Sequence, residues 1–451
     1  MATSSQRLPS PAATAPHAFG AALVGRVRSA ASTTPGRMRA VSLGVLGCIL
    51  LAWALGFAAV GSRQKGIHSV GTDVEPVVVT SQSIQSLMSG ANASAANSFL
   101  AGGVEPANQR ARYLTDLQQA QDQLAQVATA GGASAKATAS IRTIAESAAT
   151  YSGLVESARA NNRQGFPVGA GYLRRANTLV SGTVIPTAET LHQESLLRLN
   201  SGYGAASSSV ATVGVAAVAV VLLVALVAAQ VFLRRRTNRV LNVGLVAATG
   251  LAVVLIGWTL FSLIGEGNQV SAARDRGDAL NVVAQARVTA FLAKSDESFA
   301  LIARGNGAGQ YRDFDAAVAR LGNPATGAGL LRQASRHAST SDEQAQVTAA
   351  GQALSAYFAV HDKIHTLDTT GSSPQAITMA LATGSGSSND AFDRLDAALQ
   401  QTGVLTQGQF DSRIRSAGRR LAGVAIGTSI GFLLVAALVL YGFEQRIREY
   451  R

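Results

Sequence analysis

Four long apolar blocks interrupt an otherwise polar chain, at residues 41–61, 210–233, 240–264 and 421–443. Each supplies about 20 apolar residues, the length that an α-helix needs to cross a hydrocarbon layer of about 30 Å. None of the blocks contains a charged residue. Their length and their uniform apolarity around the helix exclude the buried helices of a soluble core. The sequence therefore predicts an integral membrane protein with four transmembrane helices.

Arginine placement predicts the orientation of these blocks. Arginines cluster before the first block, between the second and third, and after the fourth. Because positive residues beside a span stay on the cytoplasmic side, we expect a multi-pass protein of the cell membrane with both termini in the cytoplasm. Arg419 and Arg420 are exceptions, whose long side chains can reach the headgroups. Most of the net charge of +12 falls in the cytoplasmic segments, so it indicates topology and not a nucleic-acid partner.

The blocks divide the chain into two similar halves, each with a span, an outside segment and a second span. Residues 97–100 align with 297–300, and residues 151–155 with 356–360, which favours an internal repeat. The expected domains are a disordered basic N-terminus at 1–40, spans at 41–61, 210–233, 240–264 and 421–443, outside segments at 62–209 and 265–420, an arginine-rich turn at 234–239 and a tail at 444–451.

Both outside segments show helical spacing of apolar residues and no strand pattern. In the first, glycine and proline break the pattern at 101–106, 131–132 and 164–169, which predicts helices at about 63–100, 107–130, 134–163 and 170–209. The second breaks at 305–309, 322–329, 369–374 and 384–388. We therefore expect an all-α fold in which the four transmembrane helices carry two extracytoplasmic antiparallel four-helix bundles.

In such a bundle, the first and third loops of the first segment form the end that lies far from the membrane. We call this end the distal tip. One interpretation is a docking face for a protein or a small molecule; the other is an ordinary capped turn whose apolar residues plug the bundle end. The candidate binding residues are Val104, Glu105, Arg110, Arg159, Asn161, Asn162, Arg163, Phe166 and Pro167, with Val168 beside them.

The cytoplasmic arginines are a second candidate surface. They can present a docking site for a cytoplasmic protein, or they can serve only topology and attraction to anionic membrane lipids. No kinase, cyclase or other output domain follows the last span in this sequence, so we expect a separate cytoplasmic protein to receive any signal. The candidate docking residues are Arg234, Arg235, Arg236, Arg239, Arg446 and Arg448.

Motifs of enzymes and cofactor sites are absent from the sequence, including a P-loop, a nucleophile elbow, zinc-ligand spacing and a dinucleotide fingerprint. We therefore expect no enzyme activity, no cofactor and no metal. His361 and His365 are four residues apart with Asp362 and Asp368 nearby, which fits either a surface metal pair or a polar helix face, and we favour the polar face. The apolar sequence continues past Cys48, whereas the sequence of a processed lipoprotein turns polar soon after its cysteine. We therefore read Cys48 as a residue of the first span.

The layout resembles a known family. Each outside segment with its spans is similar to the four-helix-bundle sensor domain of bacterial chemoreceptors, most closely at residues 151–156 and 172–176. Two such units without an output domain resemble the actinobacterial GlnX-type membrane signalling proteins. This resemblance covers about 40–443. It implies a relay of amino-acid availability from an extracellular solute-binding lipoprotein to a cytoplasmic Ser/Thr protein kinase.

Two other functions remain open from the sequence. Paired bundles could organise an envelope complex as a structural scaffold. Alternatively, the protein could be a direct small-molecule sensor in which Arg110, Arg159 or Arg163 binds a carboxylate. We expect the relay, because the layout and the absence of an output domain agree with it.

Overall fold

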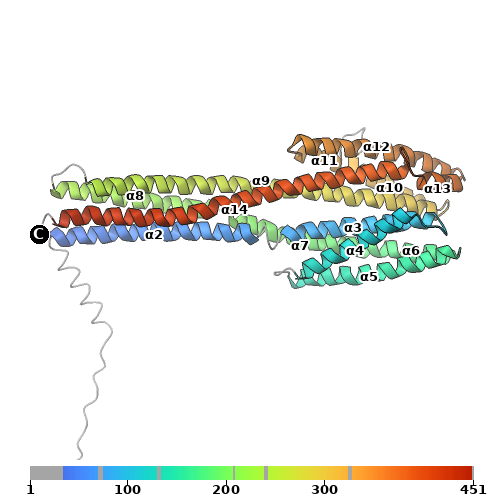
Figure 1. Ribbon diagram of the computed structural model, residues 1–451, viewed down its shortest axis with the longest axis horizontal. Coiled ribbons are helices and arrows are strands. Elements are labelled where there is room, and N and C mark those ends of the chain that lie inside the picture. The colour runs from blue at the N-terminus through green and yellow to red at the C-terminus, as the bar shows by residue number, and fades with distance from the viewer. Residues whose placement is uncertain are drawn as a thin grey trace, which may run out of the picture. The chain divides into compact units, whose positions relative to one another are not determined.

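The computed structural model describes residues 34–69, 75–129, 134–206, 209–237, 242–322 and 328–448. The described residues are helical, with no strand, which confirms the predicted fold class (Figure 1). Residues 1–33, most of the predicted disordered N-terminus, lie outside them. The helices are α2 (Thr34–Ser69), α3 (Glu75–Leu100), α4 (Ala107–Thr129), α5 (Ala135–Arg163), α6 (Val168–Leu179), the π-helical turn η2 (Val180–Val184), α7 (Ile185–Ala206), α8 (Ser209–Thr237), α9 (Val243–Ile302), α10 (Ala308–Gly322), α11 (Leu330–His337), α12 (Ser341–Thr369), α13 (Ser373–Leu381) and α14 (Ser388–Arg448).

The chain forms two compact units. The first, called the span unit, contains Met1–Gly61, Ser209–Ile264 and Ala422–Arg451. The second, called the polar unit, contains Ser62–Ser208 and Gly265–Leu421. Each unit therefore combines pieces from both halves of the sequence.

In the span unit, 4 helices are long and apolar enough to cross a membrane, which confirms the four predicted blocks. These helices fit a multi-pass membrane protein. Their candidate spans are Gly36–Gly66, Thr212–Arg235, Val243–Gly265 and Gly423–Gln445.

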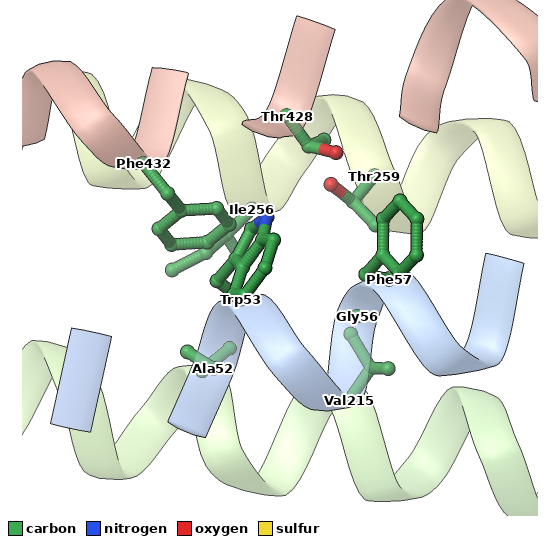
Figure 2. Close-up of a pocket in the computed structure, with 10 residues that line it drawn as sticks. Ala52, Trp53, Gly56, Phe57, Val215, Ile256, Thr259, Thr428 and Phe432 are labelled. Atoms are coloured by element: carbon green, nitrogen blue, oxygen red, sulfur yellow. The ribbon is translucent and has the colours of Figure 1, made fainter. Parts of the chain in front are cut away.

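Side chains from all four spans meet around a cavity of about 20 Å³, room for about one water molecule (Figure 2). Thr259 and Thr428 give this apolar cavity two hydroxyl groups, but each hydroxyl donates to a carbonyl of its own helix. Trp53 Nε1 donates to Ser429 Oγ over 3.1 Å and so ties α2 to α14. The spans thus use small and weakly polar residues where helices approach one another.

The polar unit has two main apolar cores. One is formed largely by helices from the first segment, with Tyr113, Ile144 and Leu173 among its residues. The other lies in the second segment, around Phe314 and Tyr357. Because residues 62–208 and 265–421 belong to one compact unit, the division into two independent bundles stays a prediction.

Most predicted breaks match helix ends. The loops at 101–106, 164–167, 303–307, 370–372 and 382–387 separate consecutive helices, as the glycine and proline residues predict. The predicted break at 131–132 lies outside the described residues, as does most of that at 322–329.

Two local features were not predicted. Thr340 caps α12, where its hydroxyl accepts from the backbone N–H of Glu343 over 3.3 Å. The predicted helix at 170–209 contains η2, where the Ile185 N–H donates to the Val180 carbonyl, one residue further back than in an α-helix. Pro186 follows and has no N–H to donate, so the local ladder of hydrogen bonds changes at this point.

Candidate functional site

The two loops of the distal tip lie together at one end of α3, α4, α5 and α6. Gly102 and Gly165 adopt positive φ angles of 75° and 72°, a conformation that favours glycine at a tight turn. Asn162 Nδ2 donates to the Phe99 carbonyl over 2.9 Å and to the Gly102 carbonyl over 3.5 Å. One amide side chain thus fastens the two loops to each other.

Ion pairs organise the polar residues of the tip. Arg159 binds Glu105 through Nε over 2.8 Å and also binds Glu156 over 2.6 Å. Arg110 binds the other Glu156 oxygen over 2.8 Å and lies over the Tyr113 ring. Burial raises the pKa of Glu156, but hydrogen bonds and charge from the two arginines outweigh it and lower that pKa. Arg110 and Arg159 are therefore already engaged by carboxylates of the protein.

Apolar side chains project from this tip. Val104 is 86% exposed, Phe166 52% and Val168 54%. They do not plug the end of the helices, which was the alternative interpretation of the tip. Exposed apolar residues beside a fixed network of charges are typical of a protein-binding surface.

The remaining tip candidates have local roles. Asn161 Nδ2 donates to the Ser157 carbonyl of its own helix over 2.8 Å. Arg163 is exposed in the last turn of α5, and Pro167 immediately precedes α6. The structure thus brings all nine predicted tip residues to one end of the unit, and leaves their binding role a prediction.

The candidate cytoplasmic arginines are only partly described. Arg234 and Arg235 are exposed near the end of α8, and Arg448 is exposed and pairs with Glu444 over 3.2 Å. Arg239 lies outside the described residues, as do the side chains of Arg236 and Arg446.

A polar seam that the sequence analysis missed joins the two segments of the polar unit. Across it, Gln82 Nε2 donates to Asn281 Oδ1 over 2.9 Å, and Asn92 Nδ2 donates to Ser295 Oγ over 2.8 Å. Asn92 Nδ2 also donates to Asn177 Oδ1 over 2.7 Å. The sequence did contain an indication, since no charged residue occurs from Val77 to Val104. A long helix of uncharged polar residues is typical of a helix that is enclosed by polar partners.

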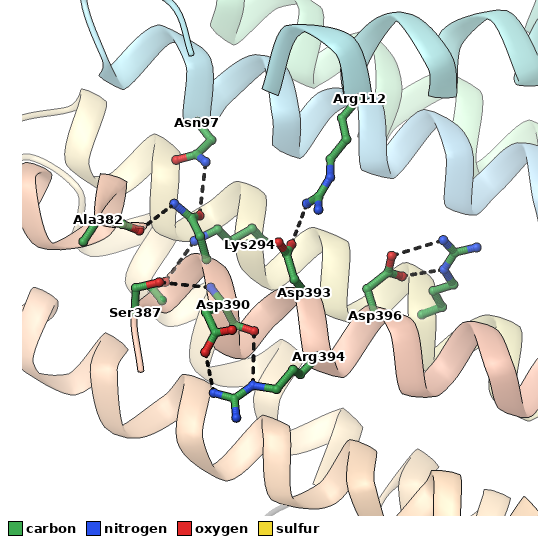
Figure 3. A network of polar contacts seen from close by, with 12 residues as sticks. Asn97, Arg112, Lys294, Ala382, Ser387, Asp390, Asp393, Arg394 and Asp396 are labelled. Atoms are coloured by element: carbon green, nitrogen blue, oxygen red, sulfur yellow. Dashed lines mark hydrogen bonds and ion pairs between the residues drawn. The ribbon is translucent and has the colours of Figure 1, made fainter. Parts of the chain in front are cut away.

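Charged pairs continue the seam toward α14 (Figure 3). Arg112 on α4 binds Asp393 over 2.5 Å, and Asn97 on α3 donates to Asn389 over 3.2 Å. Within the second segment, Arg287 binds both oxygens of Asp396, over 2.6 and 3.2 Å. The contacts of Arg112 and Asn97 thus join the two segments through directional bonds in addition to apolar packing.

A buried ionic cluster lies in the second segment. Lys294 Nζ is 2.8 Å from Glu297 Oε1, and His361 Nδ1 is 2.8 Å from Glu297 Oε2. Ser388 Oγ also donates to Glu297, over 2.9 Å. Burial raises the pKa of Glu297, but Lys294 and His361 outweigh it and lower the pKa from 4.5 to about 2. Glu297 is therefore a carboxylate at neutral pH.

The histidine pair is not a surface site. His361 is buried and stacks on Phe314 at 3.4 Å between ring centroids, in contrast to the predicted polar face. Tyr311 lies between the pair and Asp368, donating to that carboxylate over 2.9 Å. Among the residues that the structure describes, no group of three or more His, Cys, Asp or Glu side chains could hold a metal ion.

Asp116 lies where α3, α4 and α9 meet. A β-carbon on Gly90 would be 2.8 Å from Asp116 Oδ2 and 3.3 Å from Phe291, so Asp116 fills the space that this glycine leaves. Burial raises the pKa of Asp116 to about 7, with Asp396 adding to the effect and Arg287 and Arg112 opposing it. Burial and Asp313 likewise raise the pKa of Asp296 to about 7.

We predict that Asp116→Asn weakens the pH dependence of stability between about pH 4 and 7. The folded pKa of about 7 exceeds the ordinary value of 3.8, so the folded protein binds more protons and loses stability as pH rises through this window. At pH 8 the variant should be more stable by about 1–2 kcal/mol, after allowance for solvent screening. Hydrogen exchange of α4 and α9 peptides at several pH values measures the stability of the variant and of the wild type. Asp296 shares the window, so the double variant with Asp296→Asn should be flatter still, and an unchanged slope contradicts the prediction.

Comparison with known families identifies part of this unit. Residues 66–204 match the actinobacterial sensor domain. No match was found among curated proteins, and none among solved structures. The matched stretch includes both tip loops and the α3 side of the seam. Together with the four helices that are apolar enough to cross a membrane, the match indicates a sensing role at a membrane.

Proposed function

We propose that this protein relays the availability of an external solute across the membrane to a cytoplasmic partner, without catalysing a reaction. The observation that carries the proposal is the sensor-domain match of residues 66–204, in a chain with four helices suited to crossing a membrane. The arginines at the span ends support an orientation with both termini in the cytoplasm. The matched segment then lies outside the cell.

The state of the tip supports docking of a protein rather than direct capture of a small carboxylate. Arg110 and Arg159, two of the three candidate arginines, already bind Glu156 and Glu105, so a free carboxylate would have to displace internal partners at these two. Val104 and Phe166 are instead exposed and can anchor in apolar pockets of a partner. Following the resemblance to GlnX-type proteins, we propose an amino-acid-binding lipoprotein as this partner, and a Ser/Thr protein kinase on the cytoplasmic side.

The contacts of Asn92 suggest a route for the relay. Asn177 lies on α6, which begins just after the tip loop, and it accepts from Asn92 on α3. Asn92 also binds Ser295 on α9, the helix that contains the third candidate span. Docking at the tip would favour one of two arrangements of this seam and shift the helices by about 1–2 Å.

The first test is crosslinking of the full-length protein in its native membrane, followed by identification of the copurified proteins. Val104→Asp with Phe166→Asp should reduce recovery of a solute-binding lipoprotein at least about tenfold, because charge replaces two apolar anchors. Phe358→Asp is the matched control, since Phe358 is an exposed aromatic residue (43%) in the second segment, and should leave recovery unchanged. Recovery of envelope-assembly proteins alone would favour the scaffold function instead.

A further inference from the structure

A groove runs between α2 and α14 in the span unit. It has a volume of about 520 Å³ and is partly open to its surroundings. Its wall combines a charged end with an apolar stretch. The lining residues are Arg39, Ser42, Leu43, Leu46, Leu440, Phe443, Glu444 and Arg448.

The charges of the groove favour an anion. Arg39 and Arg448 bring two guanidinium groups, while the single carboxylate, Glu444, pairs with Arg448 over 3.2 Å. The lining therefore has a net positive charge. Guanidinium groups bind phosphate oxygens through paired hydrogen bonds, which makes a phosphate group the best match for this end.

The apolar stretch identifies what carries the phosphate. Leu43 and Leu440 are 69% and 49% exposed, although both lie within candidate membrane spans. Hydrocarbon surrounds such positions in a membrane, and a phosphorylated peptide could not enter there without leaving backbone groups unpaired. A molecule with an anionic head and an acyl chain satisfies both parts of the groove.

We propose that this groove binds one anionic phospholipid, with its phosphate at Arg39 and Arg448 and an acyl chain along Leu43, Leu46 and Leu440. The bound lipid joins the ends of the first and last spans and occupies Arg448, a candidate residue for docking a cytoplasmic protein. This site goes beyond the relay and does not depend on it, since it requires only that α2 and α14 lie in a membrane.

The test uses full-length protein in nanodiscs of phosphatidylcholine and phosphatidylglycerol, with native mass spectrometry of the lipid that stays bound. An arginine that binds the headgroup directly, through charge-assisted hydrogen bonds, should favour a retained anionic lipid about fivefold. Arg39→Gln with Arg448→Gln should therefore lower the preference for retained phosphatidylglycerol by roughly 10–25-fold. Arg234→Gln with Arg419→Gln removes two arginines that do not line the groove. These two charges attract anionic lipid at the surface in general and hold no single molecule, so the preference among retained lipids should change less than twofold.

Two results would overturn the site. An unchanged preference in the groove variant means that these arginines do not hold the headgroup. An equal loss in both double variants means general attraction of a basic protein to an anionic surface, without a defined site. Fluorescence of Trp53 and Trp258, both in the span unit, reports whether each variant keeps its packing.

Discussion

Replacing Lys294 with methionine should lower the free energy of unfolding of the polar unit by about 3–5 kcal/mol. Lys294 is buried, and its Nζ lies 2.8 Å from Glu297 Oε1. Without it, Glu297 remains buried with part of its charge uncompensated. Hydrogen exchange of peptides from α9 and α12, followed in denaturant on the full-length protein, measures the loss.

Two controls separate this effect from general damage. Adding Glu297→Gln to Lys294→Met removes the uncompensated charge and should restore a large part of the lost stability. Arg394→Met breaks an exposed pair with Asp390 at 2.6 Å and should cost no more than about 0.5 kcal/mol. A Lys294 variant as mild as the Arg394 variant would show that the cluster is not a main support of the fold.

The same cluster should weaken in acid. The pKa of Glu297 is lowered from 4.5 to about 2 in the folded protein. The stability that this carboxylate contributes is therefore fully present above about pH 4.5 and is lost as pH falls toward 2. The Lys294→Met with Glu297→Gln variant should lack this part of the acid sensitivity.

The second large effect is expected at the contact between α9 and α14. A β-carbon on Gly244 would be 2.8 Å from the Gly442 Cα and 3.0 Å from the Leu438 carbonyl oxygen. Both are backbone atoms, so Gly244→Ala must push the helices apart. It should also strain the hydrogen bond from Asn242 Nδ2 to the Gly442 carbonyl. We expect a loss of about 1–3 kcal/mol, the usual cost of overpacking.

Gly250→Ala is the matched control for this contact. It lies on the same helix, but a β-carbon there has no neighbour within 4 Å. Because alanine favours a helix more than glycine does, this variant should be as stable as the wild type or slightly more stable. Thermal unfolding followed by tryptophan fluorescence compares the two, since Trp53 and Trp258 both lie in the span unit and Trp258 on α9 contacts α14 at Gly427. Equal midpoints for the two variants would contradict the close packing.

Sequence alone predicted the parts of this fold that depend on local chemistry. Apolar blocks predicted the spans, and the glycines and prolines at 101–106 and 164–169 predicted the ends of α3 and α5. The cap at Thr340 was missed although a Thr-x-x-Glu pattern was present. The turn η2 was missed because a single extra residue in a helix barely changes the apolar spacing.

The candidate site, too, was predicted only where it depends on local sequence. The tip residues came together as predicted, since two short loops at neighbouring helix ends need no long-range information. The seam was missed because hydrogen bonds such as Asn92 to Ser295 join residues of different segments, and either polar side chain would read as solvated on its own. His361 was read as part of a polar face because the sequence does not reveal Glu297 as its partner, 64 residues away.

The most direct test of the relay is the change in cytoplasmic Ser/Thr phosphorylation after glutamine is added to living cells. Cells with the wild-type protein should respond, as should cells with the Phe358→Asp control. Cells with Val104→Asp and Phe166→Asp should not respond, although that variant reaches the membrane in equal amount. A full response in cells that lack the protein altogether would contradict the account.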